Sequence, residues 1–293
     1  FTFGSTGGGS IVYDKGNHLW QSSTGKFVTT GGTQNTISAA NGGFINPQSA
    51  NTVNFDVADG SDAVDLLVSV AIGSGNYTKS GAGTLSITSF STLGGGSVSQ
   101  PNLTINAGTF DVGGTARLTT SGQATGVVTS NILNNGVYRH SSSGAQTLSG
   151  IMSGTGALTQ NGSGTLTISG TNTYTGTTTV SGGTLQLDGS THANSAVAIA
   201  TAGTLTGSGT VNGNATLTGN GIINKASGTL AGTLGVTGGN WNGAGAVTGL
   251  VTSSSGNFNI GNGANLTANG GLNVTGGTIA AGNAASKITG SLN

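Results

Sequence analysis

Short runs of alternating apolar and polar residues follow one another along this chain, and glycine-containing breaks separate them. Between Asn161 and Gly189 there are three such runs, residues 165–168 (TLTI), 177–180 (TTTV) and 184–187 (TLQL). Alternation with a period of two and many Thr, Val, Leu and Ile residues indicates strands, whereas Gly, Asn and Ser clusters indicate turns. This segment lacks the i, i+3, i+4, i+7 spacing of a helix. The pattern predicts an all-β chain of very short strands.

The second half of the chain repeats this pattern at a nearly constant interval. Four-residue sequences that contain glycine and end in an aliphatic or aromatic residue start at positions 182, 202, 219, 238, 255 and 276. A fixed short period is the sequence signature of a solenoid. We therefore predict a β-solenoid with about 19 residues per coil, in which each coil holds three strands that pair in parallel with the next coil.

Stacked coils place equivalent inward residues in one common core, while Thr and Ser occupy the outward positions. The predicted core residues are Leu166, Ile168, Val180, Leu185, Leu187, Leu205, Val211 and Leu217.

Three regions follow from the regularity of the pattern. Residues 1–10 form a short aromatic strand, Phe1-Thr2-Phe3, on a glycine tether, and we interpret them as an N-terminal arm. Residues 11–65 fit the repeat poorly and are expected to form an irregular β region or a cap. Residues 66–293 are predicted to form the solenoid shaft, and the most apolar run, residues 65–72, is expected to be one fully buried strand.

Composition supports an ordered, neutral and repetitive chain. Gly accounts for 58 of 293 residues, charged residues make up 5% and the formal net charge is zero. Disordered chains usually combine high net charge with few β-branched residues, and this chain has the opposite balance. A neutral chain has no electrostatic footprint for nucleic acid. It also lacks cysteine and a long apolar run, so we expect no thiolate metal site and no membrane insertion.

The segment GSGTLTISGTNTYTGTTTVSGGTLQLDG, from Gly162 to Gly189, resembles the passenger-associated transport repeat of bacterial autotransporters. A diluted copy begins with GAGTLSI at Gly81 and continues into LTINAGTFDVGG, residues 103–114, but it lacks the NTYTG core. The resemblance implies a right-handed parallel β-helix outside a bacterial cell. It implies no particular activity, because such repeats build shafts that carry many functions.

Four of the seven acidic residues are close together and form a candidate calcium site, namely Asp56, Asp59, Asp62 and Asp65. Calcium prefers six to eight oxygen ligands. The i, i+3 spacing of these aspartates matches no standard calcium loop, so we favour a solvated turn and expect no cofactor.

Catalytic groups are sparse. His192, Asp188 and some serine could form a Ser-His-Asp triad, but so many serines make such coincidences common. His18 and His140 lie elsewhere, and we interpret His192 as a surface-loop residue. Glutamate is absent, and no acidic residue follows Asp188. Polysaccharide-cleaving enzymes need clustered carboxylates or metal-assisted groups, so we predict that the chain is not an enzyme.

The larger aromatic residues could stack on sugar rings or simply fill the core. They are Tyr13, Trp20, Tyr77, Tyr138, Tyr174 and Trp241. Because Tyr174 belongs to the repeat pattern, we favour a structural role.

These features indicate a structural extracellular protein, such as a filament or biofilm-matrix subunit on a bacterial surface. An adhesin that binds glycans or surfaces is the alternative, with matrix polysaccharide as a partner. Because the C-terminal strand pattern carries no obvious cap, we expect copies to associate head to tail, with Phe1, Thr2 and Phe3 docking on a neighbour. The chain begins with Phe1 and no basic segment, so we expect that a signal peptide has been removed.

Overall fold

The computed structural model describes residues 2–3, 9–13, 24–39, 44–45, 51–94 and 101–292. Every regular element in these ranges is a β-strand, and the strand pairs run parallel. The chain divides into two compact units, residues 1–156 and 157–293. Each unit is a stack of coils in which strands of successive coils pair, which confirms the predicted parallel β-solenoid. The described ranges contain no helix that could span a membrane.

Unit 1, residues 1–156, contains four parallel ladders. The first ladder runs β1 (Thr2–Phe3), β3 (Thr24–Thr29), β6 (Thr52–Val57), β8 (Ala71–Ser80), β11 (Leu103–Ile105), β15 (Ile132–Asn134) and β18 (Met152–Ser153). The second runs β2 (Ser10–Tyr13), β4 (Asn35–Ala39), β7 (Leu66–Val68), β9 (Thr84–Ile87), β12 (Thr109–Val112) and β16 (Val137–His140). The third joins β5 (Phe44–Ile45), the first half of β8, β10 (Ser91–Leu93) and β13 (Leu118–Thr120). The fourth pairs β14 (Val127–Val128) with β17 (Gln146–Leu148).

Coils in unit 1 are mostly longer than the predicted period. Asn35 pairs with Leu66, and Thr109 pairs with Val137, so both steps along the chain exceed that period clearly. The step from Leu66 to its partner Leu85 matches it. The extra residues lie in turns and loops between strands, so a coil lengthens without changing the ladder.

The apolar run at residues 65–72 is not one strand. β7 ends at Val68, Ser69 is exposed, and β8 begins at Ala71 in a different ladder. The chain turns a corner here without a glycine. Because glycine is the residue from which we predicted the turns, the sequence carries no sign of this corner. Strand pairing continues across the boundary predicted between residues 65 and 66, because β4 on one side pairs with β7 on the other.

Unit 2, residues 157–293, is a regular three-sided stack. One side is β20 (Thr165–Ile168), β22 (Thr184–Leu187), β24 (Thr204–Thr206), β27 (Ile222–Asn224), β30 (Gly239–Trp241), β33 (Asn257–Ile260) and β35 (Thr278–Ala281). A second is β19 (Ala157–Gln160), β21 (Thr178–Val180), β23 (Val197–Ile199), β26 (Ala215–Leu217), β29 (Leu234–Val236), β32 (Val251–Ser253) and the end of β34 (Asn265–Val274). The third is β25 (Thr210–Val211), β28 (Thr229–Leu230), β31 (Ala246–Val247), the start of β34 and β36 (Lys287–Leu292).

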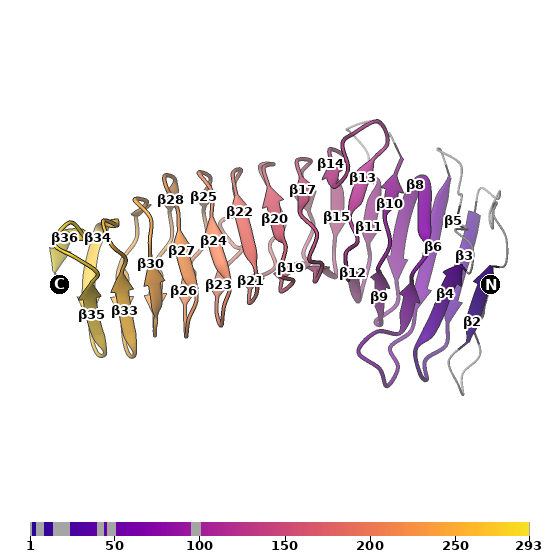
Figure 1. The fold of residues 1–293 in the computed structure, drawn as a ribbon, viewed down its shortest axis with the longest axis horizontal. Coiled ribbons are helices and arrows are strands. Elements are labelled where there is room, and N and C mark those ends of the chain that lie inside the picture. Colours follow the sequence, from indigo (N-terminus) through magenta and orange to yellow (C-terminus); the bar gives the residue numbers. More distant parts are fainter. Residues whose placement is uncertain are drawn as a thin grey trace. The chain divides into compact units, whose positions relative to one another are not determined.

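The steps between paired residues in unit 2 match the predicted period. Thr165 pairs with Thr184, and Thr184 pairs with Thr204, so one coil separates each residue from the next. Side chains alternate between buried and partly exposed along β20 and β22. Figure 1 shows the strands from β20 to β35 side by side, each one coil further along the stack.

Glycine allows close approach of successive coils at several corners. A Cβ atom on Gly209 would lie 1.9 Å from the carbonyl oxygen of Gly189 in the preceding coil. Such a distance is far below van der Waals contact, so no larger residue fits without a backbone shift. The high glycine content therefore has a packing function in addition to forming turns.

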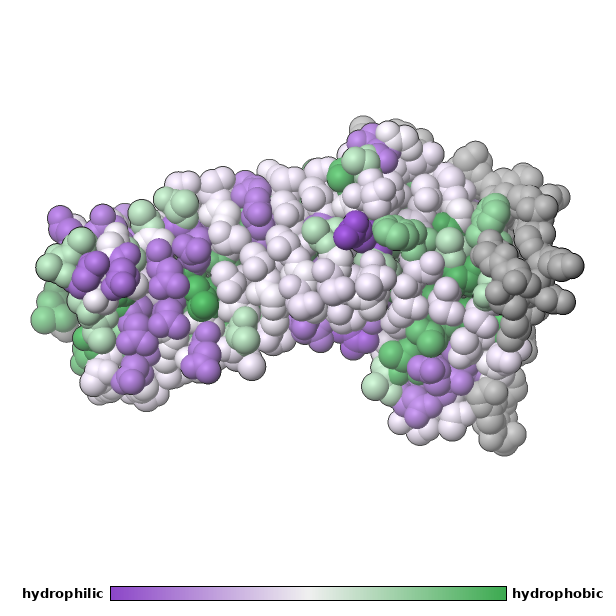
Figure 2. All heavy atoms as spheres, in the orientation of Figure 1, coloured by the Kyte–Doolittle hydropathy of each residue, from purple (hydrophilic) through white to green (hydrophobic). Residues whose placement is uncertain are grey.

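The outer surface is nearly uncharged. On the face drawn in Figure 2, hydrophilic side chains of unit 2 gather over the coils nearest the C-terminus. Asparagines of adjacent coils are hydrogen-bonded on these coils: Asn259 Nδ2 donates to Asn240 Oδ1 at 3.1 Å. Thr278 Oγ1 donates to Asn257 Oδ1 at 2.6 Å. Stacked coils thus pair their outward side chains as well as their backbones.

Candidate functional site

All eight predicted core residues of unit 2 are buried, none with more than 2% of its surface exposed. They lie on all three sides of the stack. Leu166, Leu185 and Leu205 occupy equivalent positions on β20, β22 and β24 and form one aliphatic ladder. These residues build the interior of the shaft and form no binding site.

The four aspartates proposed for calcium do not come together. Asp56 forms an ion pair with Lys26 at 2.8 Å, and Asp62 accepts a hydrogen bond from the Gln34 amide. Asp65 is buried and accepts hydrogen bonds from the amides of Gly60 and Thr84, both at 2.7 Å. Asp59 is exposed. No group of three or more His, Asp or Glu residues in the described ranges could hold a metal ion.

The triad drawn from sequence is not assembled. His192 Nδ1 accepts a hydrogen bond from the Asn194 amide at 3.1 Å, so this nitrogen does not donate to a carboxylate. Asp188 instead accepts hydrogen bonds from Gln186 Nε2 and the Ser208 amide. His192 and Asn212 line a shallow polar hollow, together with Thr171, Asn172 and Ser190. His140 is buried in unit 1, and His18 lies outside the described residues.

The aromatic side chains considered for sugar stacking are mostly interior. Tyr77, Tyr138, Tyr174 and Trp241 are each at most 1% exposed, so the structural interpretation holds for these four. Trp241 Nε1 donates to the carbonyls of Gly243 and Asn265, which satisfies its polar edge. Trp20 and the side chain of Tyr13 lie outside the described residues.

The N-terminal strand has a partner within its own chain. β1 pairs in parallel with β3, with Thr2 opposite Val28 and Phe3 opposite Thr29. β1 is the last strand of its ladder, so its other edge has no strand in the described part of unit 1. The detached arm expected from sequence is thus an edge strand at residues 2–3, whereas Phe1 lies outside the described residues.

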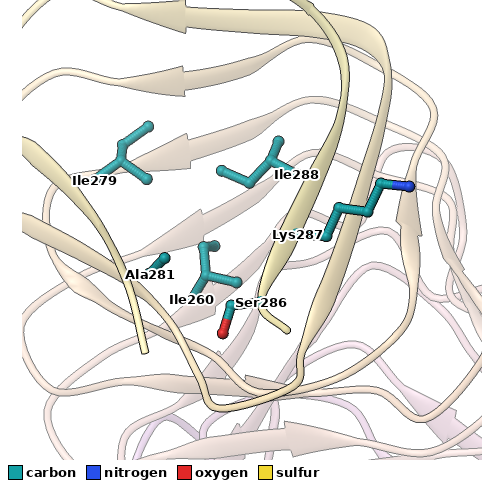
Figure 3. Close-up of a pocket in the computed structure, with 6 residues that line it drawn as sticks. All are labelled: Ile260, Ile279, Ala281, Ser286, Lys287 and Ile288. Carbon is teal, nitrogen blue, oxygen red and sulfur yellow. The ribbon is translucent and has the colours of Figure 1, made fainter. Parts of the chain in front are cut away.

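The last coil of unit 2 encloses an apolar hollow of about 250 Å³. Ile260 of β33, Ile279 and Ala281 of β35, and Ile288 of β36 line it. Figure 3 shows the three isoleucines directed toward one another, while the Lys287 side chain runs away from them. Ile279 and Ile288 are only partly buried, unlike the inward residues of the coils before them. These isoleucines continue the apolar interior of the preceding coils and are themselves partly exposed in the described structure.

Sequence reasoning missed a buried polar cluster on the outside of unit 1. Asp111 accepts hydrogen bonds from Ser86 Oγ at 2.8 Å, Ser141 Oγ at 2.7 Å and Arg139 Nε at 2.9 Å. Asp111 lies opposite Ser86 and Arg139 in the ladder of β9, β12 and β16. Three donors satisfy the carboxylate, so the cluster joins three coils and offers no free base.

Two lysines lie inside the solenoid, a placement that the sequence did not reveal. Lys79 Nζ donates to the carbonyls of Ser80, Gly81 and Ala107, at 2.9, 2.8 and 3.2 Å. Lys225 Nζ donates to the Gly207 carbonyl at 2.9 Å. Burial lowers the pKa of each lysine to about 8, partly opposed by nearby aspartates. The ammonium groups bind turn carbonyls and are not available for catalysis.

Comparison with known proteins identifies the repeat. A family model described as the passenger-associated-transport-repeat matches residues 78–112 and 158–187. Searches of the curated proteins and of the solved structures gave no significant match. The two matched segments run from the end of β8 to β12 in unit 1 and from β19 to β22 in unit 2, and the second includes the NTYTG core. The chain therefore carries two copies of the passenger-associated transport repeat, the repeat of bacterial autotransporter passengers, built into the coils of a parallel β-solenoid.

Proposed function

We propose that this chain is a structural shaft exposed at a bacterial surface, and that copies of it join end to end into a filament or matrix fibre. Passenger repeats imply exposure at or beyond the cell surface. The observation that carries the assembly step is the group of apolar side chains in the C-terminal coils, where Ile260, Ile279 and Ile288 surround a hollow and the last two are partly exposed. Covering these side chains would remove apolar surface from water.

Unpaired strand edges support the same proposal. Among the described residues, β35 and β36 pair with the preceding coil alone, and β1 is the outermost strand of its ladder in unit 1. Such edges carry free N–H and C=O groups that can pair with another chain. The strand pairs of both units are parallel, so an edge strand of a second copy would extend a ladder by the same parallel pairing. A head-to-tail contact of this kind does not close and produces an open filament.

The absence of catalytic activity belongs to the same proposal. In the described ranges Asp111 is saturated by donors, the lysines at 79 and 225 are bound to carbonyls, and Asp188 is not near a base that it orients. Assays on a panel of polysaccharides, with and without calcium, test this part. Reproducible turnover that disappears on mutation of Asp59 or Asp62 would overturn it.

Electron microscopy of the purified chain tests the assembly. We expect fibres from the wild type, loss of fibres for Ile288→Asp, which puts a charge in the hollow, and loss of fibres on deletion of residues 1–9. Thr177→Asp places the same charge on an exposed position of the regular stack and should leave fibres intact. If the wild type remains monomeric at high concentration, or if Ile288→Asp forms normal fibres, assembly through this end is wrong. Dispersed particles that bind glycans would instead favour an adhesin.

A further inference from the structure

Phe90 and Arg117 are neighbours on successive coils of unit 1. Phe90 directly precedes β10 and Arg117 directly precedes β13, and these strands pair with Ser91 opposite Leu118. The Ser91 amide donates to the Arg117 carbonyl at 3.1 Å, so the register of the β10–β13 pair extends to Phe90 and Arg117. The ladder therefore places the two side chains side by side.

The Arg117 side chain differs from the other described cations of unit 1 and from the interior Lys225, whereas Lys287 of unit 2 is simply exposed to solvent. Lys26 and Arg139 are paired with aspartates, and the two interior lysines bind carbonyls. Within the described ranges the Arg117 side chain has neither an ion pair nor a hydrogen bond, and its Nε is shielded from water without a hydrogen-bond partner. Its guanidinium carbon lies 5.8 Å from the centre of the Phe90 ring. Burying the Nε donor without an acceptor is costly, and the other guanidinium nitrogens, which are not among the buried unsatisfied atoms, remain for an external acceptor.

Two glycines leave room for the Arg117 side chain, which packs close against their backbone. A Cβ atom on Gly144 would lie 2.7 Å from Arg117 Nε, and one on Gly126 would lie 3.1 Å from Arg117 Cδ. Glycine is required at position 144, because the Cβ of any other residue there would overlap the Arg117 guanidinium. The guanidinium is consequently positioned before any ligand arrives, which lowers the entropy lost on binding.

Phe90 supplies an apolar platform beside the cation. Half of its surface is exposed, a high fraction for a phenylalanine in a chain whose other described aromatic side chains are largely buried. The turn at residues 121–125 is also exposed and ends next to Gly126, which contacts Arg117. This turn carries hydroxyl and amide groups from Ser121, Gln123 and Thr125 and no charge.

We propose that Phe90 and Arg117 form a binding site for uronic acid units of an acidic polysaccharide. The planar guanidinium matches a carboxylate in a bidentate geometry. The exposed part of the phenylalanine ring can pack against the apolar face of a sugar ring. The hydroxyl-rich turn offers hydrogen bonds for sugar hydroxyls. This site is independent of end-to-end assembly, because it lies on the side of the coils of unit 1.

An acidic peptide fits the same surface less well. Peptides with many carboxylates bind clusters of cations, and the site has a single guanidinium on a neutral chain. Recognition must then come from short-range contacts. The ligand that suits Phe90 and Arg117 has an apolar ring face next to a carboxylate. A uronic acid has this combination in every unit.

Binding of the full chain to immobilised polygalacturonate, with dextran as the neutral polymer, tests the site. We expect binding to polygalacturonate only, and a loss of about tenfold or more for Arg117→Gln, which removes the charged fork. Phe90→Ala should weaken binding several-fold, and Gly144→Ala should weaken it by displacing Arg117. The matched control is Lys26→Gln, which removes an exposed cation of unit 1 that pairs with Asp56 and should change nothing. Circular dichroism and thermal melting of each variant establish that it is folded.

The proposal is overturned by three results. These are no binding of the wild type to polygalacturonate, equal binding by the Arg117→Gln and Lys26→Gln variants when both are folded, or equal Arg117-dependent binding to polyglutamate. The last result would assign the site to acidic chains of any backbone. Arg117→Lys adds a sharper criterion, because lysine keeps the positive charge but lacks the two parallel N–H donors of the guanidinium. We expect weaker binding than the wild type with a similar dependence on salt.

Discussion

The Tyr174 hydroxyl and Thr178 Oγ1 lie 2.6 Å apart inside the coil, with both residues fully buried. Tyr174 is the tyrosine of the NTYTG core of the repeat. Ser195 Oγ of the next coil lies 3.4 Å from Thr178 Oγ1 and donates to the Gly176 carbonyl at 2.7 Å. The motif thus folds its tyrosine inward and completes a polar network across two coils.

Tyr174→Phe removes one hydrogen bond from this network and keeps the ring. We expect a loss of about 1 kcal/mol in the free energy of unfolding, with Thr178 still in contact with Ser195. Urea denaturation followed by circular dichroism measures it. A variant as stable as the wild type would contradict a stabilising role for the hydroxyl.

Leu185→Ala tests the inward ladder. Leu185 is 1% exposed and stacks between Leu166 and Leu205, so the cavity should cost about 2–5 kcal/mol. Thr177→Ala, at an exposed position, should change the unfolding free energy by less than about 0.5 kcal/mol. Equal destabilisation by the two substitutions in denaturant melts would refute the assigned register.

Gly209→Ala tests the close approach of coils. The added Cβ would lie 1.9 Å from the Gly189 oxygen, and we expect a loss of roughly 1–3 kcal/mol. Gly235→Ala is the control, because its Cβ would meet nothing closer than 3.8 Å and it lies within β29. That change should be neutral or stabilise by up to about 1 kcal/mol. Thermal melting compares the two, and similar effects would show that proximity to Gly189 is not the constraint.

Stability should depend on pH in the alkaline range. The pKa of Lys79 and of Lys225 falls from 10.5 unfolded to about 8 in the folded chain. Between these values the unfolded state binds more protons, so stability rises with pH from about 8 to 10.5. Burial raises the pKa of Tyr174 from 10.0 to about 12, so stability falls as pH rises from 10 to 12. We expect a maximum near pH 10.

Denaturant midpoints measured from pH 7 to 11 check this profile. Lys225→Met removes one titrating group and should flatten the rise between pH 8 and 10 without moving the fall above pH 10. If the variant keeps the full rise, Lys225 is not its source.

The sequence predicted the regular part of the fold and little of the polar interior. In unit 2 the alternation of leucine with threonine assigned inward and outward residues such as Leu187 and Thr177, because a period of two leaves only one buried face. Ser69 breaks an apolar run without any glycine, so the corner between β7 and β8 has no local signal.

The interior lysines and the exposed Phe90 were not predictable for a different reason. Hydropathy assigns lysine to the surface and phenylalanine to the core, whereas the positions of Lys225 and Phe90 depend on neighbours in adjacent coils, which are distant along the chain. Arg117 likewise depends on Gly144 of a following coil.

Lys225 lies between two glycines of the stack. Its ammonium binds the Gly207 carbonyl of the coil before, and a Cβ on Gly245 of the coil after would lie 3.3 Å from Lys225 Cβ. One long side chain therefore fills space that both neighbouring coils leave empty. The room for this side chain is set by the adjacent coils as well as by its own coil. Substitutions should then be tolerated in compensating sets spaced by one coil, so that the interior of such a protein can change composition while its cross-section stays the same.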